Sequence, residues 1–186
     1  MSLLTRPLTY ADVQAMPPDG NRYEIIDEEL VVSAAPNKKH QRWSYLLTRM
    51  VGNVVDDGQL GEVYTAPVDV RLFPGRDTPI VQPDLIFIRS DRLHIFGSDL
   101  VEGAPDLVVE ILSPSTRTLD LTRKAQLYAE AGVPEYWVAD PDEPSLRIYA
   151  LRDRRYEEIP AKDERVASAV VPGLVVDLGT LFDVLG

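Results

Sequence analysis

The sequence predicts an α/β (α+β) fold in which a central mixed β-sheet is flanked by helices. Short apolar segments that are typical of strands alternate along the chain with segments whose apolar residues recur at helical spacing. Asp106–Leu112 is an almost continuous apolar run, as in a strand covered on both faces. The 186 residues are 45% hydrophobic and 26% charged. This length and composition suit one globular domain over residues 1–186.

The first elements are a short helix and a hairpin. Thr9–Met16 has a threonine at its start that can cap a helix, and a proline- and glycine-rich segment follows it. Tyr23–Ile26 and Leu30–Val32 are rich in residues that favour strands. We expect these two strands to form a hairpin around a tight turn at Asp27–Glu28.

The segment from residue 37 to about residue 55 predicts a long amphipathic helix. Its apolar residues are spaced three and four positions apart, which places them on one face of a helix. These residues are Trp43, Leu46, Leu47, Met50, Val51 and Val54. The opposite face would remain polar.

The rest of the chain predicts further strands and two helices. The expected strands are Val63–Tyr64, Val68–Leu72, Asp84–Ile88, Asp106–Leu112, Tyr136–Asp140 and an outer hairpin of Leu146–Tyr149 and Tyr156–Ile159. One helix is expected from about Leu119 to Ala131, because Gly132 after it suits a helix C-terminus. A final helix is expected over Leu178–Leu185. Mixed strands and helices in this order favour a single mixed sheet.

Charge and composition restrict the function classes. The chain has no cysteine, which excludes disulfides and thiolate metal sites. It has no signal-peptide pattern and no apolar run near the roughly 20 residues that span a bilayer, so we expect a cytoplasmic protein that makes no membrane contact. The formal net charge is −11, which counts against a nucleic-acid binder because such proteins usually present a basic surface.

Four charged residues nevertheless stand in apolar segments. They are Glu24, Asp84, Glu110 and Lys124, the last on a helix stripe with Leu121, Ala125 and Tyr128. Buried charges are costly unless they are paired or bind a metal. Such a set could hold Mg²⁺, or Mn²⁺, for phosphodiester hydrolysis.

Each residue then has a predicted role. Asp84 and Glu110 would be direct metal ligands, and the backbone carbonyl of Ile111 could be a third ligand. Glu24 would be a nearby base or an additional ligand. Lys124 would contact the phosphate or the attacking water.

Structural alternatives remain open for all four side chains. Asp84 could cap a turn before its strand, and Glu110 could form a buried ion pair with Lys124 without catalysis. Glu24 could lie on the solvent face of its strand. Lys124 could extend its ammonium group to water.

Other polar residues are weaker candidates. His40 opens the long helix and could reach a site near Glu24, although a surface or capping role is the alternative. Arg117 and Arg123 flank the helix of Lys124 and are the preferred phosphate-binding candidates. Ser113 and Ser115 favour helix capping, Tyr128 favours the core, and Gln126 points away from Lys124.

Several blocks resemble one known family. They are Tyr23–Asp27, Gln82–Leu85, Pro105–Thr116, Lys124 with Tyr128, Ala131–Trp137 and Asp140–Pro141. Together they resemble the Uma-two family, described as bacterial restriction endonucleases of the PD-(D/E)XK nuclease superfamily, over nearly the whole chain. The resemblance implies a restriction-endonuclease-like core, Mg²⁺ as cofactor and DNA as substrate.

The chain departs from that pattern at two positions. The usual superfamily lysine lies two residues after the acidic residue, where this chain has Leu112; the resemblance suggests that Lys124 has taken over its role. Glu28 stands where the family commonly has glycine. Because glutamate does not readily adopt positive φ, we expect a different turn type there.

Two other functions stay open at this stage. The acidic charge and Leu112 are compatible with a catalytically silent binding or assembly module on the nuclease fold. A phosphodiesterase acting on RNA or another substrate is also compatible. Cleavage of both strands of a duplex favours a homodimer, with Trp43 and the final helix as an interface, although these residues equally suit a core.

Overall fold

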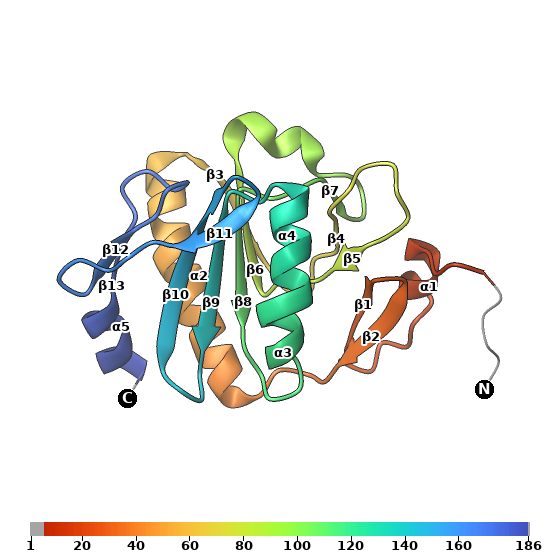
Figure 1. The fold of residues 1–186 in the computed structure, drawn as a ribbon, viewed down its shortest axis with the longest axis horizontal. Coiled ribbons are helices and arrows are strands. Elements are labelled where there is room, and N and C mark those ends of the chain that lie inside the picture. Colours follow the sequence, from red (N-terminus) through yellow and green to blue (C-terminus); the bar gives the residue numbers. More distant parts are fainter. Residues whose placement is uncertain (1–5, 186) are drawn as a thin grey trace.

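The computed structural model describes residues 6–185 and contains a six-stranded mixed sheet at its centre (Figure 1). The strand order is β11-β10-β9-β8-β6-β3. Their bounds are β3 Gly61–Thr65, β6 Leu85–Arg89, β8 Leu107–Ile111, β9 Glu135–Asp140, β10 Ser145–Arg152 and β11 Arg155–Glu158. The pair β8 and β9 is parallel and its neighbours are antiparallel. The predicted mixed sheet is therefore confirmed.

The expectation of a single sheet is wrong, because the remaining strands pair among themselves. A five-stranded sheet has the order β2-β1-β5-β4-β7, and β12 pairs with β13. The bounds are β1 Arg22–Ile26, β2 Glu29–Ser33, β4 Val70–Arg71, β5 Ile80–Val81, β7 Val101–Glu102, β12 Arg165–Ala167 and β13 Val175–Asp177. Residue patterns indicate strands but not their partners, since pairing depends on residues distant in the chain.

Helices cover both faces of the central sheet (Figure 1). The helical elements are α1 Tyr10–Gln14, α2 Lys38–Gly58, η1 Ser90–Ile95, α3 Arg117–Leu119, η2 Asp120–Lys124, α4 Ala125–Ala131 and α5 Leu178–Leu185. The long helix α2 packs with alternate residues of β6 and β8, including Leu85 and Val109. The other residues of these strands, including Ile86 and Val108, pack toward Tyr128 of α4. The central strands are therefore buried on both sides, as their apolar runs predict.

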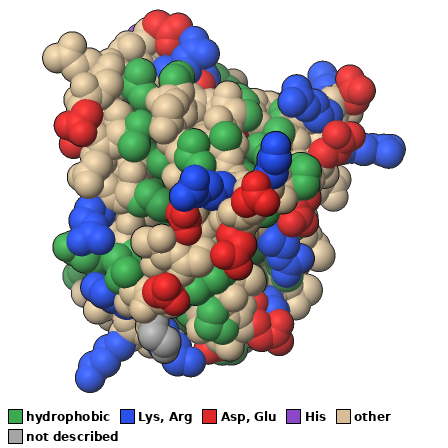
Figure 2. All heavy atoms as spheres, turned by 90° about the vertical axis from the view of Figure 1, so that its left-hand side faces the viewer, with side chains coloured by type: hydrophobic (Ala, Val, Ile, Leu, Met, Phe, Trp, Pro, Cys, Tyr) green, Lys and Arg blue, Asp and Glu red, His purple; other side chains and the backbone are tan. Residues whose placement is uncertain are grey.

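Among residues 6–185, no helix has both the length and the apolar character needed to cross a membrane. On the face shown in Figure 2, Lys and Arg side chains are interspersed with Asp and Glu, so neither sign of charge covers that face.

The predicted helix over Leu119–Ala131 is present but interrupted. Its middle part, Asp120–Lys124, is a π-helix, and Gly132 ends the helix with φ 85°. Because π-helical hydrogen bonds join residues five apart, the wider turn changes which side chains face the sheet. The predicted stripe is consequently wrong at Leu121, which is 36% exposed.

The β1–β2 hairpin keeps a tight two-residue turn. Asp27 and Glu28 have φ 50° and 64°, as a type I′ turn requires at both central residues. The expected change of turn type is therefore wrong. The five backbone pairs of the hairpin, from Arg22↔Ser33 to Ile26↔Glu29, hold the turn in this conformation.

Trp43 and helix α5 belong to the core and not to an exposed interface. Trp43 is buried, and its ring centroid lies 6.2 Å from that of Phe182. Leu181 is also buried, and Leu178 packs against the same core. These apolar residues therefore cover the central sheet, and the expectation that they supply a dimer interface is wrong.

Candidate active site

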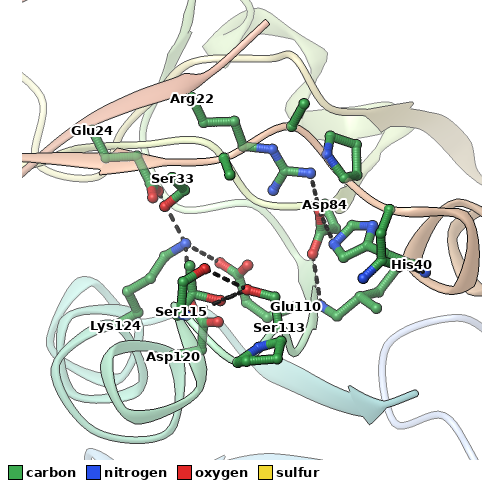
Figure 3. A pocket seen from close by; sticks show the side chains of 17 residues that line it. Arg22, Glu24, Ser33, His40, Asp84, Glu110, Ser113, Ser115, Asp120 and Lys124 are labelled. Carbon is green, nitrogen blue, oxygen red and sulfur yellow. Dashed lines mark hydrogen bonds and ion pairs between the residues drawn. The ribbon is translucent and has the colours of Figure 1, made fainter. Parts of the chain in front are cut away.

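A cavity of about 210 Å³ lies where β1, the start of α2, the ends of β6 and β8, and the π-helix meet. All four predicted site residues line it: Glu24, Asp84, Glu110 and Lys124 (Figure 3). They come from four separate segments of the chain. The fold thus brings together the four charged residues that interrupt apolar segments of the sequence.

Asp84 and Glu110 lie side by side at the end of two neighbouring strands. Leu85 of β6 pairs with Val109 of β8, so one further step of this register places Asp84 opposite Glu110. Residues directly opposite in an antiparallel pair project to the same face, with Cβ atoms about 5 Å apart. In addition, the backbone N–H of Ile111 donates a hydrogen bond of 2.7 Å to Asp84 Oδ2.

Asp84 is surrounded by hydrogen-bond donors. Its Oδ1 atom lies 2.5 Å from a guanidinium nitrogen of Arg22 and 3.1 Å from Nε2 of His40. Burial alone would raise the pKa of Asp84, but His40, Arg22 and the Ile111 N–H together lower it below its usual value. Asp84 is therefore held as a carboxylate although it is only 2% exposed.

Lys124 is surrounded by carboxylates. Its Nζ atom lies 3.0 Å from Glu24, 2.6 Å from Glu110 and 3.5 Å from Asp120. These four side chains are buried. The pKa of Lys124 is raised well above its usual value, because the attraction of the three carboxylates outweighs the effect of burial. The ammonium group is consequently charged at neutral pH.

The carboxyl group of Glu110 has a strongly raised pKa. Its pKa is raised to about 8, because the raising effects of burial and of the neighbouring acids Asp120, Asp84 and Glu24 outweigh the lowering effect of Lys124. Tyr128 also donates a hydrogen bond of 2.5 Å to Glu110 Oε1. A strongly perturbed carboxyl group beside a fixed charge in a cavity is typical of functional sites.

The helical segment from Asp120 to Tyr128 supplies the lysine side of the site. Asp120, Lys124 and Tyr128 are spaced four residues apart, and all three are buried. The backbone of Asp120 also accepts a hydrogen bond from Tyr136 Oη at 3.0 Å. This four-residue spacing therefore presents a carboxyl group, an ammonium group and a phenol in one line toward β8.

The structure decides between the alternatives for these side chains. Glu24 lies in the cavity and not on a solvent face, since it accepts a hydrogen bond of 2.8 Å from the backbone N–H of Gln82. Lys124 is 2% exposed and does not extend to water. The ion pair of Glu110 with Lys124 exists, and Asp84 is buried in the site.

Two residues of the cavity were missed by sequence reasoning. Arg22 and Asp120 were not predicted at all. His40 does reach the cavity that Glu24 lines, as one of its alternatives predicted, and contacts Asp84 there. A signal for Arg22 was present, because it lies two residues before Glu24 and therefore on the same face of β1. Asp120 similarly lies four residues before Lys124.

The arginines preferred for phosphate binding do not line this cavity. Arg117 pairs with Asp140 at 2.6 Å, and Arg123 pairs with Asp27 at 2.5 Å. Arg117 therefore joins the start of this helical segment to the end of β9, and Arg123 joins the π-helix to the β1–β2 turn. Ser113 lines the cavity rim, and its hydroxyl accepts a hydrogen bond from Thr116 N at 3.3 Å, as expected for capping.

The residues present are chemically suited to a divalent cation. Asp84 Oδ1 is buried and has ion-pair contacts, yet it has no aligned hydrogen-bond partner. Within residues 6–185, no three His, Asp or Glu side chains form a ready-made metal cluster. Mg²⁺ commonly binds through only one or two carboxylates, with water and substrate oxygens completing its shell. Asp84 and Glu110 meet this smaller requirement.

Comparisons with known proteins show the family and the fold of this chain. The curated protein "Uncharacterized protein sll1609" of Synechocystis sp. (strain ATCC 27184 / PCC 6803 / Kazusa) is 26% identical over 105 residues, which cover 56% of this chain and 58% of that protein. The chain therefore spans under two thirds of the curated relative that it matches.

A solved structure is similar over almost the full length. It is described as "a putative nuclease belonging to DUF820" from Anabaena variabilis ATCC 29413, with a TM-score of 0.77 and 20% sequence identity over 97% of this chain and 100% of that one. This likeness shows the fold. Residues 10–179 also match the Uma2 family model, described as "Putative restriction endonuclease". The chain belongs to the Uma2 family.

Proposed function

We propose that this chain is a divalent-metal-dependent endonuclease that hydrolyses phosphodiester bonds in DNA. The observation that carries the proposal is the pairing of Asp84 and Glu110 on adjacent strand ends, with Lys124 Nζ 2.6 Å from Glu110. The carboxylate oxygens are suitable ligands for a divalent metal ion, and the ammonium group beside them can stabilise the negative charge that develops on a phosphate during hydrolysis.

Mg²⁺ is the proposed ion, with Mn²⁺ as a substitute. Asp84, Glu110 and the carbonyl of Ile111 would hold it, and when bound it would polarise the phosphate and lower the pKa of a coordinated water. Lys124 would donate a hydrogen bond to a phosphate oxygen or to the attacking water. Glu24, 3.0 Å from Lys124, would accept a proton or orient that lysine.

Calorimetric titration of Mg²⁺ and Mn²⁺ tests the proposal, followed by cleavage assays on DNA and RNA. The wild type should bind metal and cleave DNA, and Asp84→Ala should do neither. Asp57→Ala, an exposed carboxylate at the end of α2, is the matched control and should behave as the wild type. Absence of both binding and cleavage in the wild type would contradict the proposal and favour a silent module on the nuclease fold.

The homodimer remains a prediction without an assigned interface. Trp43 and α5 are part of the core, so a dimer would have to use other surfaces. Light scattering on the purified chain measures its mass in solution, and a mass of one chain at all concentrations would remove the prediction.

A further inference from the structure

Helix α2 carries positive charge in an otherwise acidic chain. Residues 38–55 contain two lysines, two arginines and no acidic residue, whereas the whole chain has a formal net charge of −11. Arg49 is exposed and has no carboxylate within ion-pair distance among the described residues. Up to the aspartates of its last turn, the exposed face of α2 is therefore a local basic surface, of the kind that an acidic protein needs for binding phosphates.

This face lines a groove that continues into the site. The groove has a volume of about 500 Å³, and α2 contributes Gln41, Ser44, Tyr45, Thr48 and Arg49 to it. It shares Arg22, Pro36, His40 and Asp84 with the cavity of the proposed active site. Asp84 is the only described carboxylate along it, and this charge is already paired with Arg22.

Tyr45 is an exposed aromatic ring between two cations. Its side chain is 55% exposed, and the guanidinium carbons of Arg42 and Arg49 lie 5.9 Å and 5.5 Å from its ring centroid. Buried apolar residues of α2 point to the opposite face, so packing does not require an aromatic residue here. An exposed ring flanked by arginines combines a stacking surface for a base with partners for the adjacent phosphates.

We propose that this groove binds a single-stranded nucleic-acid segment that leads to the scissile phosphate. One unpaired base stacks on Tyr45, a neighbouring phosphate pairs with Arg49, and the strand enters the site past Arg22. A paired base in a duplex has no free face for Tyr45, so the ring selects an unpaired segment. The route to the scissile phosphate rests on the proposed function, whereas binding in the groove requires neither metal nor catalysis.

Fluorescence anisotropy tests the proposal with a labelled DNA strand of about 16 nucleotides, near the upper site size of a single strand-binding domain. EDTA is present, so that binding is measured without cleavage. Tyr45→Ala should weaken binding between about fivefold and a hundredfold, as loss of one stacked base implies. Tyr45→Phe keeps the ring and should bind as the wild type. Arg49→Ala should weaken binding. It should also reduce the slope of log affinity against log salt concentration by about one, as loss of one phosphate contact implies.

Arg76 provides the matched control. Its guanidinium carbon lies 5.1 Å from the Phe73 ring centroid, so it is also an exposed arginine on an aromatic ring, but it lines neither cavity. Arg76→Ala should leave binding unchanged. Equal binding by wild type, Tyr45→Ala and Arg49→Ala would overturn the proposal, as would an equal loss in Arg76→Ala.

A duplex of the same length separates the two kinds of substrate. It should bind more weakly than the single strand and should not respond to Tyr45→Ala; equally tight binding through Tyr45 would overturn the single-strand assignment. The metal and cleavage assays are read separately. A chain that binds the strand through Tyr45 but cleaves nothing would support the groove and refute the proposed endonuclease. Cleavage that is unchanged in Tyr45→Ala and Arg49→Ala would support the endonuclease and refute the groove as the path of its substrate.

Discussion

Two groups of charges share one cavity and have opposite balances. In the first, the single carboxylate of Asp84 contacts Arg22 and His40. In the second, the single ammonium group of Lys124 contacts three carboxylates, those of Glu24, Glu110 and Asp120. We call these the aspartate group and the lysine group. Strand β1 supplies one residue to each, because Arg22 and Glu24 lie on the same face of it.

The pKa directions follow from these balances. The donors around Asp84 lower its pKa, whereas burial and neighbouring acids raise that of Glu110 to about 8. The lysine group thus has more carboxylates than its one cation can neutralise, while Arg22 already neutralises the aspartate group. An added divalent cation would neutralise the excess carboxylates of the lysine group, and it would compete with Arg22 for the carboxylate of the aspartate group.

Removal of the lysine charge is expected to give the largest effect. In Lys124→Met three buried carboxylates lose their only cation, which should lower the free energy of unfolding by about 3–5 kcal/mol above pH 8. Urea denaturation measures it. Lys162→Met, on an exposed loop, should change stability by less than about 0.5 kcal/mol. Similar stabilities of the two variants would show that the lysine group is not a coupled ion-pair network.

Substitution of Arg22 tests the aspartate group. Arg22→Gln removes a cation that competes for Asp84, so Mg²⁺ or Mn²⁺ should bind about tenfold more tightly, equivalent to roughly 1.4 kcal/mol. Calorimetry measures the affinity, with Arg92→Gln as the control because Arg92 pairs with Asp106 outside the cavity. Weaker metal binding in Arg22→Gln would mean that the guanidinium supports the ion and does not compete with it.

The pH dependence of stability separates the two groups in the metal-free protein. Because folding raises the pKa of Glu110 from 4.5 to about 8, its contribution to stability is fully present below pH 4.5 and is lost as pH rises toward 8. Glu110→Gln should therefore flatten the decline in this window by up to about 1.4 kcal/mol per pH unit. Urea denaturation between pH 5 and pH 8 checks this. Glu157→Gln, on exposed β11, should keep the wild-type slope.

The hairpin turn should have the smallest effect, and none on the site. Glu28 has φ 64°, and glycine accepts this conformation without strain, so Glu28→Gly should raise the free energy of unfolding by about 0.5–1 kcal/mol. Denaturation measures the gain, and metal affinity should not change. Glu29→Gly, in the regular strand β2, is the control and should instead lower stability. A gain at both positions would argue that turn strain is not the cause.

Much of the site could be predicted because its residues contradict their local pattern. Glu110 interrupts a strand that is otherwise apolar, and Lys124 lies in a helix segment that packs on the sheet. Burying such a charge is costly unless it is paired or binds a metal. Each residue therefore indicates a polar site even before the fold is known. The block around Glu110 also resembles the family strongly enough to indicate the core.

Partners and backbone irregularities could not be predicted in this way. Arg22 looks like an ordinary polar residue at the start of a strand, and its role depends on Asp84, which is more than 60 positions away. The π-helix likewise could not be predicted from the spacing of apolar residues, and Leu121 is exposed although that spacing placed it on the buried stripe. Glu28 shows the same limit, since pairing across the hairpin overcomes its preference against positive φ.

The sequence by itself thus determined the strands of the central sheet, the long helices, the mixed α/β class and the four charges of the candidate site, because periodicity and local polarity act over a few residues. Only the tertiary structure decided which sheet each strand joins, which cation faces Asp84 and how the basic face of α2 meets the cavity. These depend on contacts between segments far apart in the chain, and their free energies are set by burial and by partners that no local pattern contains.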